Sequence, residues 1–259
     1  MTERANIADI LCIGCQKGST SWLHSVLNHH PKTWAFPDSE PITSTDKEAH
    51  FWDWNHERGT DWYRSLLTPQ YPDQLSMDFT PEYALMSDNQ IAECKQLNPT
   101  ANVIYILRDP LARTVSALRM SMLWNLGKEH KQPLSLDEQF FTFLTKARVA
   151  QHGDYMRNIT AWRKHYPDLT LINYEEFHTN RENSVSDTFA RLGLDEADIT
   201  GEAAESLAAL MKGRVWQSEK FQMERPVLMF LEGLVWRTRK SVESELGMRF
   251  TEGAEMLGV

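Results

Sequence analysis

Short apolar runs alternate along this chain with segments whose apolar residues recur at helical spacing. The clearest run is 101–107, ANVIYIL, which is β-branched and apolar nearly throughout, as expected for a strand in the middle of a parallel sheet. Other apolar runs predict further strands at 8–14, 34–36, 75–79 and 169–174. The segments between them predict helices at 19–30, 60–67, 87–97, 110–125, 136–150, 154–165 and 181–192.

Strands that alternate with helices in this way predict an α/β protein. We expect a three-layer, P-loop-like fold in which a central, mainly parallel sheet is flanked by helices. The 259 residues suit a single domain over 1–259. From about residue 200 the pattern is helical apart from a polar break near 212–220. We therefore expect a helical C-terminal part, 200–259, that acts as a lid or as the face of a homodimer.

An anion-binding turn is predicted where the first strand meets the first helix. The sequence there is ADILCIG, CQKGST and SWLHSVL, so the strand passes through Lys17 and Gly18 into a helix that Ser19, Thr20 and Ser21 open. The first backbone N–H groups of such a helix have no partner within it, and they point out of the fold at the positive end of the helix dipole. Together with Lys17 they favour a phosphate or a sulfate.

A second anion site is predicted after the strand at 101–107. Arg108 ends that strand, and the Asp-Pro pair that follows is suited to begin a helix. Ser116 lies two turns further on, at a spacing that lets its hydroxyl and the planar guanidinium of Arg108 converge on one phosphate. Because ligands of parallel sheets bind at the carboxyl ends of the strands, Lys17 and Arg108 are expected at the same edge.

The charge balance narrows the classes of partner. The chain has 27 basic and 36 acidic residues and a net charge of −9, which opposes a nucleic-acid surface and a polyanionic acceptor. No run approaches the ~18 apolar residues of a membrane span. The N-terminal MTERANIAD also lacks the apolar stretch of a signal peptide. We therefore expect no integral membrane segment and a cytoplasmic location.

Cys12 and Cys15 have the spacing of a CxxC motif. A thioredoxin-type motif would begin its helix at the first cysteine, whereas Cys12 lies within the predicted strand. The sequence has no second CxxC or CxxH that would complete a zinc site. We interpret both cysteines as structural thiols and expect no metal.

Four motifs resemble those of one enzyme family. KGSTSW after a strand resembles the 5′-phosphosulfate loop of sulfotransferases that use 3′-phosphoadenosine-5′-phosphosulfate (PAPS). VIYILRDPLARTVS resembles their 3′-phosphate-binding segment, in the Arg-Asp-Pro form of the carbohydrate-type members. KEAHFWD at 47–53 and DFTPEY at 78–83 resemble segments of the heparan-type enzymes, although Asp78-Phe79 replaces the usual charged pair. The resemblance covers about residues 8–120.

The resemblance implies a sulfotransferase that moves a sulfuryl group from PAPS, in line and without a metal, to an acceptor hydroxyl or amine. The product nucleotide is then adenosine 3′,5′-bisphosphate (PAP). Glu48 is implied as the base that takes the acceptor proton, and Lys17 as the charge that stabilises the leaving phosphate. Arg108 and Ser116 are implied to hold the 3′-phosphate. His50 is the alternative base, because cytosolic sulfotransferases use a histidine. It lies two residues from Glu48, so on an extended segment both side chains would point the same way.

Several residues near these motifs have two interpretations. Trp22 matches a position at which cytosolic members stack an aromatic ring on adenine, but it also suits the core. Arg113 is either a surface charge or a support of the nucleotide site, and Lys47 is either a solvated neighbour or a donor-site contact. Four aromatic residues either line an acceptor cleft or belong to the core: Trp52, Trp54, Trp62 and Tyr63.

Two other functions and the acceptor stay open at this point. A P-loop kinase or NTPase would need GxxxxGK[ST], whereas here Lys17 precedes Gly18. A non-catalytic module would bind the nucleotide without transfer. The acceptor is expected to be a small molecule, a lipid-linked alcohol or a neutral glycan. Lys212, Gly213 and Arg214 are candidates for a loop that closes on the nucleotide, although the Gly-rich form of the family is not intact.

Overall fold

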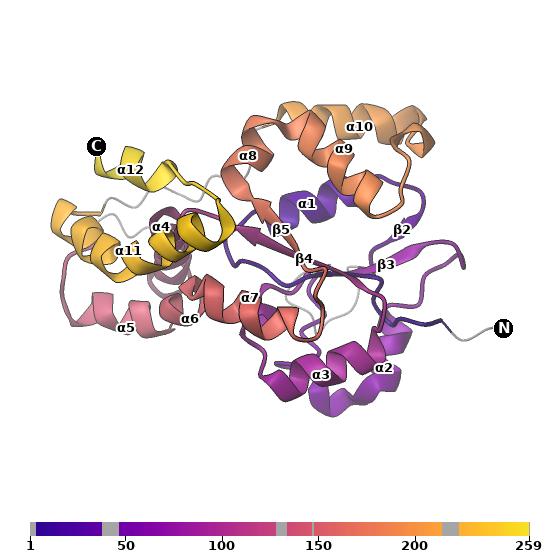
Figure 1. The fold of residues 1–259 in the computed structure, drawn as a ribbon, viewed down its shortest axis with the longest axis horizontal. Helices are drawn as coiled ribbons and strands as arrows, with labels where there is room; N and C mark the ends of the chain where they lie inside the picture. The colour runs from indigo at the N-terminus through magenta and orange to yellow at the C-terminus, as the bar shows by residue number, and fades with distance from the viewer. Residues whose placement is uncertain (1–3, 38–46, 128–133, 147, 214–222, 259) are drawn as a thin grey trace.

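The computed structural model describes residues 4–37, 47–127, 134–146, 148–213 and 223–258. At its centre is a five-stranded sheet whose strands are all parallel (Figure 1). The strands are β1 (Ile10–Cys12), β2 (Thr33–Trp34), β3 (Leu75–Asp78), β4 (Asn102–Leu107) and β5 (Thr170–Asn173), in the order β2-β3-β1-β4-β5. The predicted parallel sheet is confirmed, and each strand is shorter than the apolar run that predicted it.

Helices cover both faces of the sheet, which confirms the three-layer α/β fold (Figure 1). One face carries α1 (Thr20–Leu27), α8 (Tyr174–Thr179), α9 (Arg181–Arg191) and α10 (Gly201–Lys212). The other carries α2 (Gly59–Leu66), α3 (Asp88–Leu97) and α7 (Tyr155–Arg163). Three short 3-10 helices connect these elements: His56–Arg58, Pro81–Leu85 and Glu196–Asp198. In the described ranges, no helix has both the length and the apolar character needed to cross a bilayer.

The pleat of β1 explains why its sequence is apolar throughout. Ile10 and Cys12 belong to the cluster that α1 and α9 cover, whereas Leu11 and Ile13 belong to the cluster on the opposite face. Successive residues of a strand point to opposite faces, and in this sheet both faces are buried. A continuous apolar run is therefore what a central strand of this fold requires.

Helix α4 (Pro110–Leu126) begins where the sequence predicts. The Asp109 side chain accepts hydrogen bonds from the backbone N–H groups of Leu111 (2.9 Å) and Ala112 (3.0 Å). Pro110 occupies the first turn, where its missing N–H costs nothing. This cap ties the start of α4 to the end of β4, and so fixes where Arg108 lies.

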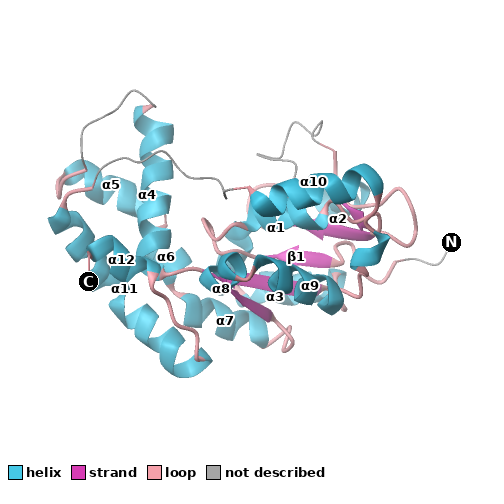
Figure 2. Cartoon of the chain, turned by 90° about the horizontal axis from the view of Figure 1, so that it is seen from above, coloured by secondary structure: helices cyan, strands magenta, loops and turns pink. Residues whose placement is uncertain are grey.

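A further group of helices packs beyond the carboxyl ends of the strands (Figure 2). It consists of α4, α5 (Glu138–Lys146), α6 (Val149–Gly153), α11 (Arg225–Leu246) and α12 (Glu252–Leu257). The single helix predicted at 136–150 is wrong, because α5 and α6 are separate. Arg148 between them has a left-handed backbone (φ 47°), which interrupts the helical hydrogen-bond pattern.

The strand order places β1 at a topological switch point. From β1 the chain fills the β3 and β2 positions on one side of the sheet, and only then β4 and β5 on the other. Ligands of parallel sheets bind outside the carboxyl end of the strand at such a point. This is the position of the loop that contains Lys17.

Candidate functional site

The loop after β1 folds tightly on itself. Lys17 and Ser19 take left-handed backbone angles, with φ of 69° and 66°, which cost a residue with a side chain about 1 kcal/mol or more each. Gly18 lies between them and donates its N–H to the carbonyl of Cys15 over 2.9 Å. A Cβ on Gly18 would lie 2.8 Å from Cys15 Sγ, so the turn has room for glycine alone unless a neighbour shifts. The turn delivers Lys17 to the start of α1.

Helix α1 begins without a side-chain cap. Ser19 at the N-cap makes no side-chain hydrogen bond to the helix, and its hydroxyl lies 3.1 Å from Nε2 of His178 instead. The first turn of α1, which the structure describes in full, contains Thr20, Ser21 and Trp22 and no acidic residue. No carboxylate of the first turn therefore neutralises the positive end of the α1 dipole, and this end of the helix suits an anion.

Lys17 and Arg108 meet at the carboxyl edge of the sheet, as the sequence predicts. Arg108 Nη1 donates to the backbone carbonyl of Lys17 over 3.0 Å. The two residues follow neighbouring strands, since β1 and β4 pair in parallel. Burial lowers the pKa of Lys17, and the nearby charge of Arg108 lowers it further. A bound anion would relieve the repulsion between these two cations.

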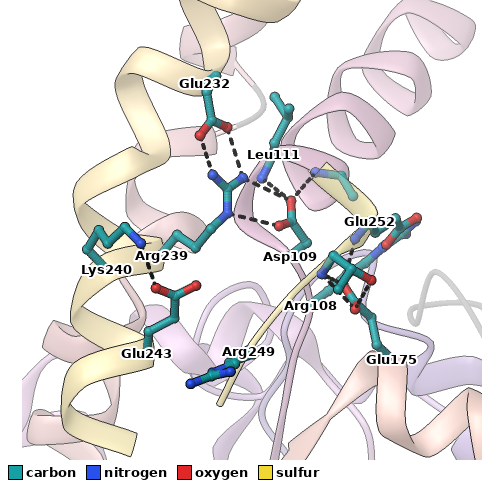
Figure 3. Close-up of polar contacts among 12 residues, drawn as sticks. Arg108, Asp109, Leu111, Glu175, Glu232, Arg239, Lys240, Glu243, Arg249 and Glu252 are labelled. Carbon is teal, nitrogen blue, oxygen red and sulfur yellow. Dashed lines mark hydrogen bonds and ion pairs between the residues drawn. The ribbon is translucent and has the colours of Figure 1, made fainter. Parts of the chain in front are cut away.

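The rest of the Arg108 guanidinium faces the C-terminal helix. Nε donates to Glu252 Oε2 over 2.8 Å and Nη2 donates to Glu252 Oε1 (Figure 3). Arg108 Cζ lies 4.5 Å from the centre of the Tyr174 ring. Burial opposes the charge, but the hydrogen bonds with Glu252 outweigh it and raise the pKa of Arg108. Ser116, the predicted second ligand of the phosphate, lies two turns along α4 and is 6% exposed.

Glu48 and His50 are brought together by a turn, not by the extended segment that the sequence suggested. His50 has a φ of 50°, and its Nε2 lies 3.2 Å from Glu48 Oε2. Asp53 Oδ2 lies 2.7 Å from Nδ1 of the same ring, so two carboxylates hold the imidazole. Burial acts against the charge of His50, but the two carboxylates outweigh it and raise the pKa of His50 to about 9. The ring is therefore an imidazolium at neutral pH.

Lys47 is buried, so its interpretation as a solvated neighbour is wrong. It is 3% exposed, and its Nζ donates to Glu48 Oε1 and to the carbonyl of Phe79 (3.2 Å). Burial opposes ionisation of Glu48, but the hydrogen bond from His50 and the charge of Lys47 outweigh it and lower the pKa of Glu48 to about 2. Glu48 is thus a carboxylate whose positive counter-charges come from the protein, and we assign no metal to it.

Asp78 supports this segment, a role that sequence reasoning missed. Its Oδ2 accepts from the hydroxyls of Tyr63 and Tyr83, both at 2.9 Å. Its Oδ1 accepts from the Thr80 hydroxyl (2.7 Å) and from the N–H of Ala49 (3.2 Å). The Thr80 and Tyr83 oxygens accept in turn from the N–H groups of the two residues after Ala49. In the sequence, Asp78 stands out only because Asp78-Phe79 replaces the charged pair that is usual in the heparan-type enzymes.

Glu82 lies between residues 47–53, here called the base segment, and residues 15–19, here called the anion loop. Its Oε1 accepts from Gln16 Nε2 over 3.2 Å. One of its oxygens also lies within 4.8 Å of a carboxylate oxygen of Glu48 and of a ring nitrogen of His50. Burial raises the pKa of Glu82; the charge of His50 acts against this rise, and the charge of Glu48 adds to it. Because Gln16 precedes Lys17, the base segment and the anion loop lie next to each other. The sequence offered no signal for Glu82 beyond its place in the DFTPEY segment.

The aromatic residues around the base segment divide between core and surface. Trp52 and Tyr63 are 2% and 0% exposed and belong to the core. Trp62 is partly buried against the same core. Trp54 is 59% exposed and stacks on the His50 ring, with centroids 3.5 Å apart and planes at 7°. Of the four aromatic candidates, Trp54 alone presents a large exposed face beside the base.

The two cysteines of the CxxC spacing are free and buried. Burial raises the pKa of Cys12 to about 12 and also raises that of Cys15. A thiol held protonated in this way is unreactive. Their interpretation as structural thiols is confirmed.

Comparison with known proteins identifies the family. Residues 8–221 match the model of the sulfotransferase domain. The chain belongs to the sulfotransferase domain family. Heparan sulfate glucosamine 3-O-sulfotransferase 5 of Mus musculus is 25% identical over 177 residues, which are 65% of this chain and 46% of the relative. The 3B1 enzyme of Homo sapiens is 23% identical over 184 residues, 71% of this chain and 43% of the relative. The chain thus spans about half the length of these curated relatives.

Two solved sulfotransferase structures share the fold. The sulfotransferase from Alicyclobacillus acidocaldarius superposes with a TM-score of 0.66 at 18% identity, over 95% of this chain and 98% of that one. The sulfotransferase domain from the curacin biosynthetic pathway gives 0.53 at 15% identity, over 95% of this chain and 99% of the other. The family uses PAPS as its sulfuryl donor.

Of the remaining residues predicted to bind the nucleotide, the structure describes Trp22, Lys212 and Gly213. Trp22 is 5% exposed and packs edge-on against Phe177, with centroids 5.2 Å apart, so its contact with adenine stays a prediction. Lys212 and Gly213 end α10, and the Gly213 carbonyl accepts from Arg181 Nη1 over 2.7 Å. Arg214 lies outside the described residues.

Arg113 is fully buried, so its interpretation as a surface charge is wrong. Its Nη2 donates to the Val149 carbonyl over 2.9 Å and to the Thr114 hydroxyl over 3.1 Å. Its charge is close enough to act on the pKa of Cys15, at the start of the anion loop. Arg113 therefore links α4 to α6 inside the fold.

Proposed function

We propose that this protein transfers the sulfuryl group of PAPS to the hydroxyl or amine of an acceptor. The observation that carries the proposal is the contact between Arg108 and the Lys17 carbonyl, 3.0 Å long, which joins two cationic sites at the ends of neighbouring strands. Two such sites suit a nucleotide with one phosphate at each end of its ribose. The family match supports the donor.

In the proposed reaction the acceptor oxygen attacks the sulfur of PAPS while the bond from sulfur to the 5′-phosphate oxygen breaks. The leaving oxygen keeps the electron pair of that bond, and Lys17 with the first N–H groups of α1 stabilises the resulting charge. Removal of one such group typically costs ~10²–10³ in rate. The products are the sulfated acceptor and PAP, and the acceptor proton passes to a base of the protein.

Glu48 is the better candidate for that base. At neutral pH Glu48 is ionised, whereas the two carboxylates around His50 keep the imidazole protonated and unable to accept a proton. His50 then orients the carboxylate through the 3.2 Å contact between Nε2 and Oε2. A positioned general base is usually worth ~10²–10⁴ in rate.

The acceptor that suits this site is uncharged. The curated relatives are named for heparan sulfate, a polyanion, but this chain has a net charge of −9. Glu48, Asp53 and Glu82 lie around His50, beside the exposed face of Trp54. Carboxylates repel an anionic chain, and an indole face packs on a sugar ring or an apolar alcohol. A small molecule, a lipid-linked alcohol or a neutral glycan therefore fits better.

Calorimetric titration of the purified protein tests the proposal. We expect PAP to bind without added metal, more tightly than ATP with Mg²⁺. A preference for Mg²⁺-ATP would support the kinase alternative and contradict the proposal. Turnover is then measured with PAPS on neutral alcohols and glycans and, separately, on heparan-type chains. Binding of PAP without transfer to any acceptor would support a non-catalytic module, and efficient turnover on heparan-type chains would contradict the uncharged acceptor.

A further inference from the structure

Glu252 lies against Arg108 in the geometry that a phosphate would use. Arg108 Nε donates to Glu252 Oε2 over 2.8 Å, and Nη2 donates to Oε1, so one whole edge of the guanidinium pairs with the carboxylate (Figure 3). The third nitrogen is held by the Lys17 carbonyl at 3.0 Å. A bidentate carboxylate and a bidentate phosphate take the same fork of an arginine. The fork predicted to bind the 3′-phosphate thus holds an anion of the protein itself.

Residues at the carboxyl end of β5 hold Glu252 in this place. The Glu175 carboxylate accepts from the Thr251 N–H (2.8 and 2.9 Å), from the Thr251 hydroxyl (2.8 Å) and from the Glu252 N–H (3.0 Å). The Asn173 side chain donates to the carbonyl of Arg249 over 3.0 Å. The chain that leads into α12 is therefore tied to the sheet edge at which Arg108 lies.

Gly253 lets α12 approach the start of α4 closely. A Cβ at this position would lie 2.5 Å from Asp109 Oδ1 and 2.7 Å from Arg239 Nη2. Asp109 caps α4, and Arg239 Nε donates to its Oδ2 over 3.0 Å. Arg239 is fixed from its other side by Glu232 of the same helix, α11. The first turn of α12 thus packs against an ion pair whose buried member, Asp109, follows Arg108 in the chain.

We infer that Glu252 is a specificity-determining residue that occupies the place of the 3′-phosphate, so that a 3′-phosphorylated nucleotide binds only as α12 releases Arg108. The inference rests on the proposed function, since it requires Arg108 to bind that phosphate. A phosphate carries more charge than a carboxylate and displaces it from the fork. The Glu252 side chain is already 29% exposed, so its return to water costs little.

The exchange has a defined consequence for affinity. Every ligand with a 3′-phosphate must break the pair between Glu252 and Arg108, whereas a ligand without one leaves that pair intact. Glu252 therefore weakens the binding of PAP and leaves that of adenosine 5′-monophosphate (AMP) unchanged. Its presence sets how strongly the site prefers the 3′-phosphorylated nucleotide.

The test is calorimetric titration of the Glu252→Gln variant of the 259-residue chain with PAP and with AMP. We expect about tenfold tighter binding of PAP, because a neutral amide holds the guanidinium less strongly than a carboxylate, and AMP affinity within about twofold of wild type. Glu255→Gln is the matched control, since it removes the same charge from an exposed position of the same helix. Unchanged or weaker PAP binding by Glu252→Gln would overturn the inference.

Hydrogen exchange of the wild-type protein provides a second measurement that needs no substitution. The amides of residues 249–258 are expected to exchange faster when PAP is bound than when AMP is bound. Equal or slower exchange with PAP would also overturn the inference. Failure of the proposed function is distinguishable, because the wild-type protein would then show no preference for PAP over AMP. If this inference alone fails, the wild-type protein still prefers PAP over AMP. Arg108→Ala then abolishes that preference, and Glu252→Gln does not alter it.

Discussion

Arg108, which follows β4, donates to the backbone carbonyl of Lys17, which follows β1, over 3.0 Å. The residue expected to bind one end of the nucleotide therefore also fixes the loop expected to bind the other end. Arg108→Lys keeps the charge but loses the planar fork. We expect about 10–100-fold weaker binding of PAP, and a smaller loss for AMP through the loosened loop. Equal losses for the two nucleotides, measured by calorimetry, would remove Arg108 from 3′-phosphate recognition.

Lys17→Ala tests stabilisation of the leaving phosphate. We expect the rate of transfer from PAPS to fall by ~10²–10³ while the melting temperature changes little, because the side chain stabilises charge that develops during the reaction. Lys32→Ala is the control, since Lys32 is an exposed lysine paired with Asp198 at 2.6 Å. Turnover by Lys17→Ala at the level of this control would exclude Lys17 from the mechanism.

Glu48→Gln tests the base. The variant keeps the size of the side chain but cannot accept the acceptor proton, so kcat should fall by ~10²–10⁴ with PAP affinity within a few-fold of wild type. Glu93→Gln provides the comparison, because Glu93 of α3 is another carboxylate paired with a histidine, His56, at 3.0 Å. A near-normal kcat in Glu48→Gln would show that His50 or another group accepts the proton.

The pH dependence of stability reports on His50. The pKa of His50 is raised from 6.5 to about 9 in the folded protein. The stabilisation by its ion pairs is therefore complete below pH 6.5 and is lost as the pH rises through 9. Urea unfolding between pH 6 and 10 should show a loss on the order of 2 kcal/mol in the wild type that is absent from His50→Gln. Parallel curves for the two proteins would contradict the charged state assigned to His50.

Asp78→Asn tests the support of the base segment. The carboxylate accepts four hydrogen bonds in a fully buried position, and an amide cannot accept all of them. We expect a loss of about 1–3 kcal/mol in the free energy of unfolding together with a lower kcat. Asp73→Asn, at an exposed position before β3, should change neither. A stable Asp78→Asn protein with full activity would show that the segment holds its geometry without this carboxylate.

The sequence predicted those parts of the molecule that depend on local patterns. Apolar runs located all five strands, and the residues after two of them located both cationic sites. The loop of Lys17 was readable because the Lys-Gly turn lies between an apolar run and an amphipathic segment. The pairing of Glu48 with His50 was expected from an extended segment and arises instead from a turn at His50.

Contacts between distant segments were beyond the reach of such patterns. Asp78 supports residues some thirty positions earlier in the chain, and Glu82 reaches back to Gln16 across a larger separation. Glu252 meets Arg108 across 144 positions. Each of these side chains is an ordinary acidic residue in its own neighbourhood, and only the packing of the helices beyond the sheet edge shows its partner. The homodimer and the lid expected of the C-terminal part stay predictions.

The position of β1 in the middle of the sheet separates the segments proposed for the two recognition tasks. The segments proposed to choose the acceptor adjoin β3 on one side of β1, and those proposed to choose the nucleotide follow β4 and β5 on the other. Lys17 follows β1, the strand that lies between the two sides. An enzyme arranged in this way can acquire a new acceptor during evolution while its donor chemistry stays constant.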